Sequence, residues 1–384
     1  MLMLDGASLE YILPRAAEAR LPNFGRMLDS GASMYLSTIR PTQPDTVWTA
    51  VATGMYPAKN GVRSAASYFA AGDDLAVDLL PDNCFSHVLV QLGIVHYQPN
   101  TSAAWRTRPV WSILNGYGIS TGIVRWPLTY PVEPVRGFVL SDRFHQLMGT
   151  MFEFDGRVAY PADVQAIAHD AFAGSETAAD PLAPPAAPGV RRPDVSGARW
   201  DRYYSRAARA LRDAYAPQFS AIRYQGLDVA GHFFLRYAQP SAVANVSDAE
   251  RQAFGGALDR YYGYIDGEIG AAIDRLQPGD LLLVVSGFGM QTVGPLKRAL
   301  GAALRQPDVS GAHDRAPDGF LLAYGTAVSP GRRPRGSIAD VTPTILYFLG
   351  LPVGRDMDGY ARADLFDKRF TADRPITFIP SHNR

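Results

Sequence analysis

Asp228 and His232 lie four residues apart in the segment "GLDVAGHFF", a spacing that puts both side chains on one face of a helix. His313 precedes the apolar segment "GFLLAYG", and Asp5 ends the first strand-like segment, "MLML". One aspartate and two histidines with a fourth position left open are typical ligands of a catalytic zinc ion. The spacing also fits a surface ion pair or a helix cap, and His313 alone could be a loop histidine.

Two hydroxyl groups are candidates for the attacking group. Thr42 and Thr46 lie in "RPTQPDTVWTAVATG", immediately before and within a segment that we expect to be helical. The free N–H groups at the start of a helix can hold an anion. These threonines therefore could lie beside a bound anionic substrate.

The composition excludes several classes of protein. Lys and Arg together number 37, as do Asp and Glu, so the net charge is zero and we expect neither a nucleic-acid surface nor a polybasic membrane anchor. Cys84 is the single cysteine, so no internal disulfide forms. No apolar run reaches the ~18 residues of a membrane helix, and no signal peptide is evident. We expect a cytoplasmic protein, although the first strand is short and the true start could lie upstream; the sequence does not indicate the oligomeric state.

The elements that must position these groups alternate along the chain. Apolar strands are expected near residues 1–4, 34–39, 120–126, 219–225, 281–286 and 319–325, with helices between them, including one long helix from Ser247 to Leu276. This alternation predicts an α/β fold with a mainly parallel sheet sandwiched between helices. We expect one domain over residues 1–384, with a small cap or insertion near 143–205 that contains a flexible Pro/Ala-rich segment, 174–199.

Motifs that run nearly end to end resemble the alkaline phosphatase superfamily, and its type I phosphodiesterase/nucleotide pyrophosphatase group in particular. They include "WTAVATGMYPAKNGV", "GIVRWPLTYP", "GLDVAGHFF", "LLLVVSGFGM", "GAHDRAPDGFLLAYG" and "SIADVTPTILYFLGLPVGRDMDG", in the order found in the family. The resemblance implies a phosphoryl-transfer site with two metal ions. It assigns one metal to Asp228, His232 and His313, and the second metal to Asp5 together with an Asp-His pair.

The sequence departs from the family at the second metal and at the nucleophile. The Asp-His pair aligns with Gly287 and Phe288, neither of which can be a ligand. The nucleophilic Ser or Thr of the family aligns with Pro44, so Thr46 could serve only after a shift of the loop, and Thr42 lies two residues earlier. The two losses are coherent, because the missing metal is the one that would activate the hydroxyl.

The loss of one cation changes the charge of the site. A single divalent ion facing Asp5 and Asp228 leaves about zero net charge, which attracts a phosphate dianion less well than a positive site. Either a basic side chain compensates, with Arg125, Lys59 and Arg63 as candidates, or Asp5 is partly neutral or acts as a base.

Three readings of the function follow. In the first, the protein hydrolyses small phosphate esters with one Zn²⁺ (Mn²⁺ is the other candidate) on Asp228, His232 and His313, using a water with Asp5 as general base. In the second, it is a non-catalytic relative that binds a metal or ligand. In the third, other residues such as Asp318 complete a second metal site. The sulfatase branch is excluded, since Cys84 lies in "NCFSH" and not in its Cys-x-Pro-x-Arg motif.

Overall fold

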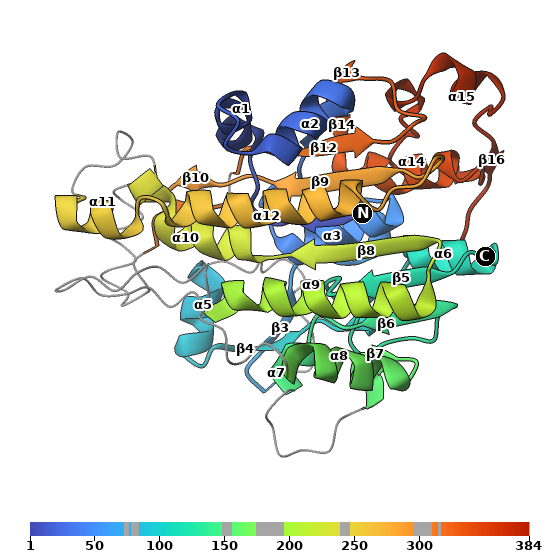
Figure 1. The fold of residues 1–384 in the computed structure, drawn as a ribbon. Helices are drawn as coiled ribbons and strands as arrows, with labels where there is room; N and C mark the ends of the chain where they lie inside the picture. The colour runs from blue at the N-terminus through green and yellow to red at the C-terminus, as the bar shows by residue number, and fades with distance from the viewer. Residues whose placement is uncertain are drawn as a thin grey trace.

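The computed structural model describes residues 1–72, 77, 84–147, 156–173, 196–238, 246–294, 309–313 and 316–383 (Figure 1). The greater part of the Pro/Ala-rich segment predicted to be flexible lies outside these residues. Across the described residues, no helix is both long enough and apolar enough to span a bilayer.

One large sheet forms the centre of the molecule. Its strand order is β13-β2-β12-β9-β1-β8-β5-β6-β7, with β14 also paired to β2. Its strands are β1 (Leu2–Leu4), β2 (Ala32–Ser37), β5 (Thr121–Val124), β6 (Gly137–Leu140), β7 (Ala159–Tyr160), β8 (Phe219–Tyr224), β9 (Leu282–Phe288), β12 (Asp318–Tyr324), β13 (Gly331–Arg332) and β14 (Gly336–Ser337). Most pairs are parallel; β12 runs antiparallel to both β2 and β9, and β7 runs antiparallel to β6.

Three two-stranded sheets lie outside this central sheet. They join β3 (Ala66–Ala70) to β4 (Val95–Pro99), β10 (Gln291–Thr292) to β11 (Gly311–Ala312), and β15 (Val353–Gly354) to β16 (Phe378–Ile379). The β10–β11 pair concerns the functional site, because His313 follows β11 directly.

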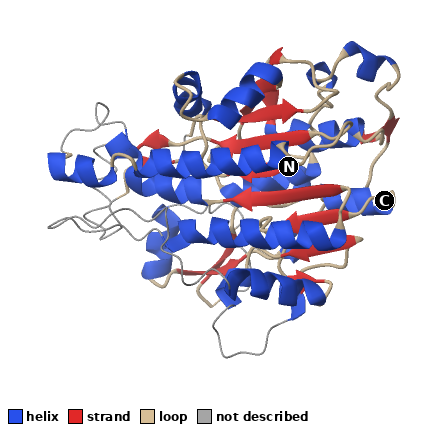
Figure 2. Ribbon diagram, viewed as in Figure 1, coloured by secondary structure: helices blue, strands red, loops and turns tan. Residues whose placement is uncertain are grey.

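Helices cover both faces of the sheet, as Figure 2 shows by the blue and red layers. They are α1 (Leu9–Ala17), α2 (Pro22–Ser30), α3 (Pro44–Thr53), α4 (Pro57–Asn60), α5 (Cys84–Gln91), α6 (Val110–Gly116), α7 (Phe144–Leu147), α8 (Asp163–Ala173), α9 (Ser196–Tyr215), α10 (Gly226–Ala238), α11 (Asp248–Phe254), α12 (Ala257–Ile273), α14 (Val341–Phe348) and α15 (Lys368–Ala372). The architecture is the predicted α/β sandwich.

Two large hydrophobic clusters pack on the central sheet, one on each face, and a third, small cluster of Ala66, Tyr68 and Val95 lies at the β3–β4 pair. Along β1, Leu2 and Leu4 join the cluster formed with α1, α2, α8, α9, α10 and α12, whereas Met3 joins the cluster formed with α3, α6 and α14. Side chains of a strand alternate between the two faces of the sheet. A residue two positions from Met3, or paired with Met3 in register, therefore lies on the same face as Met3. Figure 1 shows α9, α10 and α12 lying across the first of these faces.

The helical stretch predicted from about Ser247 to Leu276 is divided into two helices, α11 and α12. Ser247 and Glu250 form a reciprocal capping box at the start of α11, and α11 ends before Gly255 and Gly256. Two successive glycines disfavour a helix interior by about 1 kcal/mol each. The ends of α3 carry the residues typical of helix ends. Pro44 is its first residue, and Gly54 ends it in a left-handed conformation, φ 67°.

The region predicted as a cap, near residues 143–205, contributes to the main sheet where it is described. Its strand β7 extends the sheet beside β6, and α8 packs on α9. The boundaries predicted for a cap remain a prediction.

Candidate metal centre

The strand β8 and the helix α10 position two of the candidate ligands. The chain leaves the carboxyl end of β8 at Tyr224 and enters α10 at Gly226, so Asp228 lies in the first turn of the helix and His232 one turn later. Carboxyl ends of parallel strands are where open α/β sheets place their sites. Both side chains therefore lie at the functional edge of the sheet.

His313 reaches the same edge because β12 runs against its neighbours. In the register of β12 and β9, Asp318 at the start of β12 is opposite Phe288 at the end of β9. A residue that precedes an antiparallel strand thus lies at the carboxyl edge of the parallel ones. The ring of His313 lies 5.1 Å from that of His232, centroid to centroid.

Ligand atoms of Asp228, His232 and His313 all lie within 4.8 Å of one another. His232 Nε2 is 3.6 Å from Asp228 Oδ2, and His313 Nε2 is 3.7 Å from Asp228 Oδ1. Two ligands of one tetrahedral zinc ion, each about 2.0–2.2 Å from it, lie roughly 3.3–3.6 Å apart. The spacing matches three donors around a shared cation.

Hydrogen bonds to the backbone fix the orientation of both imidazoles. His232 Nδ1 lies 2.7 Å from the carbonyl of Gly311, and His313 Nδ1 lies 3.1 Å from the carbonyl of Thr42. A carbonyl only accepts, so each Nδ1 carries the hydrogen and each Nε2 is left with a lone pair. Metal-binding histidines in proteins use this same arrangement.

The carboxylate of Asp228 is buried and incompletely satisfied. Its Oδ1 has no hydrogen-bond partner among the described residues, and its side chain is only 10% exposed. Burial raises the pKa of Asp228, and the charge of Asp5 adds to this rise, while the interactions with His232, His313 and Arg223 oppose it. An unpaired buried acceptor is costly, and a cation bound between the three side chains would satisfy it.

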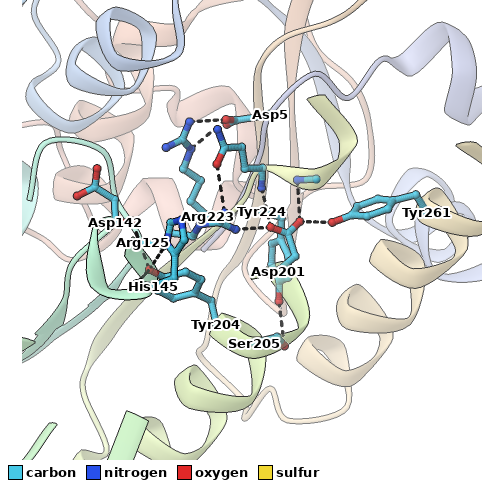
Figure 3. Close-up of polar contacts among 12 residues, drawn as sticks. Asp5, Arg125, Asp142, His145, Asp201, Tyr204, Ser205, Arg223, Tyr224 and Tyr261 are labelled. Atoms are coloured by element: carbon cyan, nitrogen blue, oxygen red, sulfur yellow. Dashed lines mark hydrogen bonds and ion pairs between the residues drawn. The ribbon is translucent and has the colours of Figure 1, made fainter. Parts of the chain in front are cut away.

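A buried network fixes the start of α10. Asp201, from α9, accepts hydrogen bonds from the backbone N–H groups of Gln225 and Gly226 at 3.0 and 2.8 Å. Arg125 and Tyr261 also donate to this carboxylate (Figure 3). Asp201 and Arg125 are 0% and 2% exposed. Side chains from three separate segments thus set where the ligand helix begins.

Asp5 lies beside the three donors but its own oxygens are occupied. Arg223 donates to Asp5 Oδ2 from Nε at 2.9 Å and from Nη2 at 2.5 Å (Figure 3). Trp48, in α3, donates its indole N–H to Asp5 Oδ1 at 2.6 Å. The next residue, Gly6, packs so tightly on Asp228 that a Cβ there would lie 2.9 Å from the Cα of Asp228.

The two family ligand positions on β9 cannot bind a metal. A Cβ at Gly287 would lie 2.3 Å from Cγ1 of Val47, so α3 fills the space a side chain there would need. Phe288 is fully buried, with its ring 5.0 Å from that of His313. Ser286 donates to the carbonyls of Ala7 and Phe288, which gives it a role in the turn.

The candidate hydroxyls differ in their contacts. Thr42 donates its hydroxyl to the carbonyl of Ile39 at 2.8 Å. Thr46, in the first turn of α3, is 2% exposed and its Oγ1 has no hydrogen-bond partner. Pro44, at the position of the family nucleophile, is the first residue of that helix. Thr46 is therefore the hydroxyl that is available for another contact.

The basic residues that we expected to compensate for charge are engaged or exposed elsewhere. Arg125 pairs with Asp201, Lys59 pairs with Asp358 at 2.6 Å, and Arg63 is exposed. Arg223, which lies in β8, is the cation beside the site. The sequence signal for it is an arginine in a mainly apolar strand segment, "FSAIRY", outside the histidine and aspartate motifs.

Asp318 has a structural role at the start of β12. It pairs with Arg40 at 3.0 Å and with Arg335 at 2.8 Å. Both carboxylate oxygens of Asp318 are thus paired with arginines, and neither is left for an additional metal ion. Asp314 lies outside the described residues.

A cavity of about 440 Å³ is lined by residues that include Leu2, Phe219, Arg212 and Leu281, and by none of the three converging donors. Leu2 and Phe219 begin strands and Leu281 precedes one, whereas the donors lie at the carboxyl edge of the parallel strands. We therefore assign the chemistry to the edge with the donors.

The α/β sandwich with a three-donor centre at the carboxyl ends of its strands is the architecture of the alkaline phosphatase superfamily. The chain belongs to the type I phosphodiesterase/nucleotide pyrophosphatase family, whose sequence profile matches residues 1–330. Among proteins with curated descriptions, none matches this chain.

Solved structures with the same fold include ectonucleotide pyrophosphatase/phosphodiesterase 5. The murine protein superposes with a TM-score of 0.53 at 14% identity, over 96% of this chain and 100% of its own. An inactive variant of that murine protein, in complex with AMP, gives the same TM-score and identity over 96% and 99% of the two chains. The human protein gives 0.53 at 13% identity, again over 96% and 99%. At these identities the likeness establishes the fold.

Proposed function

We propose that this protein is a metal-dependent hydrolase of small phosphate esters, of the phosphodiesterase/nucleotide pyrophosphatase type. The observation that supports this most directly is the convergence of Asp228, His232 and His313 with their Nε2 and carboxylate atoms within 4.8 Å. Membership of the family supports the substrate class. The AMP complex of the murine relative is consistent with a nucleotide phosphoester as substrate.

The three donors fit a zinc ion, with Mn²⁺ as the alternative. Two neutral imidazoles and one carboxylate are a common catalytic zinc set, and their partial exposure, 27% for His232 and 17% for His313, leaves the centre open to an entering ligand. When bound, the cation supplies Lewis-acid polarisation of a phosphoryl oxygen. We propose one cation per chain at these residues.

The protein groups would then orient the substrate and the attacking water. The carbonyls of Gly311 and Thr42 keep both rings in place, and the Asp201 network keeps Asp228 at the start of α10. We propose direct attack by water, since Pro44 replaces the family nucleophile. Asp5 remains our proposed base, although Arg223 and Trp48 occupy its oxygens in the structure, and Thr46 remains the alternative nucleophile.

The test measures hydrolysis of bis-p-nitrophenyl phosphate by the zinc-loaded protein. We expect His232→Ala to abolish turnover, while His169→Ala, on the exposed side of α8, keeps it. Thr46→Val should retain turnover if water attacks directly, and should lose it if Thr46 is the nucleophile. Turnover by His232→Ala equal to that of the wild type would refute the proposal.

A second candidate function is a non-catalytic protein that binds a metal or phosphate ligand through the same three donors. The observation in its favour is the loss of ligand chemistry at Gly287 and Phe288, together with the engaged carboxylate of Asp5. Zinc binding without turnover across a broad panel of phosphate mono- and diesters would support this function over the first.

A further inference from the structure

Arg223 is a buried cation at the position where the family resemblance places a second metal. It is the next-to-last residue of β8 and is paired in register with Met3 of β1. Alternation along the strands therefore puts Arg223 and Asp5 on the same face, toward α3. The side chain of Arg223 is 7% exposed and that of Asp5 is 0% exposed.

The guanidinium of Arg223 is a permanent positive charge. Burial acts to lower the pKa of Arg223, but the charge of Asp5 and its hydrogen bonds raise that pKa above the usual range, with smaller contributions from Asp45 and Asp142. A guanidinium also forms a fork that suits a carboxylate oxygen better than an ammonium does. Arg223 thus stays charged under all ordinary conditions.

The neighbouring protein atoms leave no coordination set for a second ion. Asp5 Oδ2 accepts from two nitrogens of Arg223, and Asp5 Oδ1 accepts from Trp48. Val47 fills the space beside Gly287, and the ring of Phe288 offers no ligand atom. These residues do not fit the second metal of the family pattern. The group that contacts Asp5 instead is the guanidinium of Arg223.

We propose that the guanidinium of Arg223 is the second cation of this site, replacing a metal ion and presenting its positive charge to an anionic phosphoryl group held at Asp228, His232 and His313. The inference rests on the proposed function. Nε and Nη2 both donate to Asp5 Oδ2, which leaves Nη1 as the guanidinium nitrogen that Asp5 does not use. A donor therefore remains for an oxygen of the ligand.

The balance of charge supports this role. One divalent cation against Asp5 and Asp228 alone would leave no net charge, and Arg223 restores a single positive charge. The site lies close enough for this to matter: Gly6, directly after Asp5, packs on the backbone of Asp228. In a poorly hydrated site a fixed positive charge attracts an anion strongly.

The experiment measures two quantities on the full chain. The first is zinc per chain after dialysis, by mass spectrometry of the metal. The second is the affinity of the zinc-loaded protein for inorganic phosphate, by calorimetry. The test variant is Asp5→Asn/Arg223→Gln, which removes one negative and one positive charge, so the net charge of the site is kept while the guanidinium donor is lost. Arg223→Lys keeps the charge without the fork. The control, Arg275→Gln, removes an exposed arginine that pairs with Asp213.

We expect one zinc per chain in all four proteins. The double variant should bind phosphate about 10- to 100-fold more weakly, as for the loss of a charged hydrogen bond, with Arg223→Lys intermediate and Arg275→Gln unchanged. A second tightly bound zinc in the wild type, or equal phosphate affinity in the double variant, would overturn the proposal. If the double variant does not fold, unchanged phosphate affinity in Arg223→Lys would overturn it, and weaker binding at full zinc uptake would support it.

Failure of the proposed function gives a different result. A wild type that takes up no zinc would contradict the metal-dependent hydrolase, since Asp228, His232 and His313 would not form a metal site. The role of Arg223 would then be decided by the same phosphate comparison on the metal-free proteins.

Discussion

Two neighbouring regions at the carboxyl edge of the sheet differ in how their polar atoms are satisfied. Around Asp228 the Nε2 atoms of His232 and His313 lie 3.6 and 3.7 Å from the carboxylate, beyond hydrogen-bond distance, and its Oδ1 has no hydrogen-bond partner among the described residues. Around Asp5 both carboxylate oxygens have protein donors. The groups around Asp228 are thus oriented but left open to an added ligand, whereas the carboxylate of Asp5 is paired by the protein itself.

The largest expected effect is the loss of metal from the unpaired region. His313→Ala should remove zinc binding at micromolar concentrations, because changes even to second-shell partners cost about 10- to 100-fold in affinity. Zinc uptake by competition with a chelator measures this. The matched control is His96→Ala, which changes an exposed histidine on β4. Unchanged zinc uptake in His313→Ala would show that His313 is not a metal ligand.

Changes at Asp5, whose oxygens are paired with protein donors, should lower the free energy of unfolding. Asp5→Asn leaves Arg223 buried without its counter-charge, which should cost about 3–5 kcal/mol of unfolding free energy. The control Asp213→Asn breaks an exposed pair, whose partners are 48% and 65% exposed, and should cost less than about 1 kcal/mol. Urea unfolding measures both, and similar costs for the two variants would contradict the structural account of Asp5.

The metal-free protein should gain stability when Asp228 loses its charge. Asp228→Asn removes a buried carboxylate with an unpaired oxygen, which should add about 1–3 kcal/mol without metal. Burial raises the pKa of Asp228, so the wild type is penalised above that pKa, and the difference should vanish below about pH 4. Saturating zinc should reverse the order, which thermal unfolding with and without zinc would test.

The smallest effect concerns a histidine outside both regions. His145 bonds Tyr204 at 3.0 Å and its ring packs on Trp200. Burial, and then the charge of Arg125, lower the pKa of His145 to about 3. A lowered folded-state pKa contributes stability above pH ~6.5 that is lost as the pH falls toward 3.

His145→Gln should therefore lose about 1 kcal/mol less than the wild type between pH 7 and 5.5. Urea unfolding at the two pH values measures this, with His169→Ala as the control that should follow the wild type. An equal loss in His145→Gln would show that this histidine does not titrate as a buried group.

Much of the fold was predictable from the sequence, because buried strands and the motifs around Asp228 and His313 are explicit in it. The position of His313 was less so. Strand direction depends on long-range pairing, and only the antiparallel course of β12 brings this residue to the correct edge. The two small sheets at β3–β4 and β15–β16 likewise depend on pairing that short segments do not reveal.

The region around Asp5 could be predicted only in part. The absence of ligand side chains at Gly287 and Phe288 is evident in the sequence. The basic residues that the sequence favoured, Arg125, Lys59 and Arg63, all lie near a family motif, whereas Arg223 lies inside a strand. The register of β1 and β8 pairs Arg223 with Met3, and only this pairing puts Arg223 on the face of the sheet that Asp5 shares.

The Asp201 network has a consequence for how this chain can diverge. One carboxylate joins Arg125, after β5, to Tyr261, in α12, and to the first amides of the helix that carries Asp228. A change at any one of these positions would leave a buried charge or donor without its partner. Substitutions at these positions should therefore occur together. Sequence drift at these three distant positions should therefore be correlated across lineages, while the loops between them vary freely.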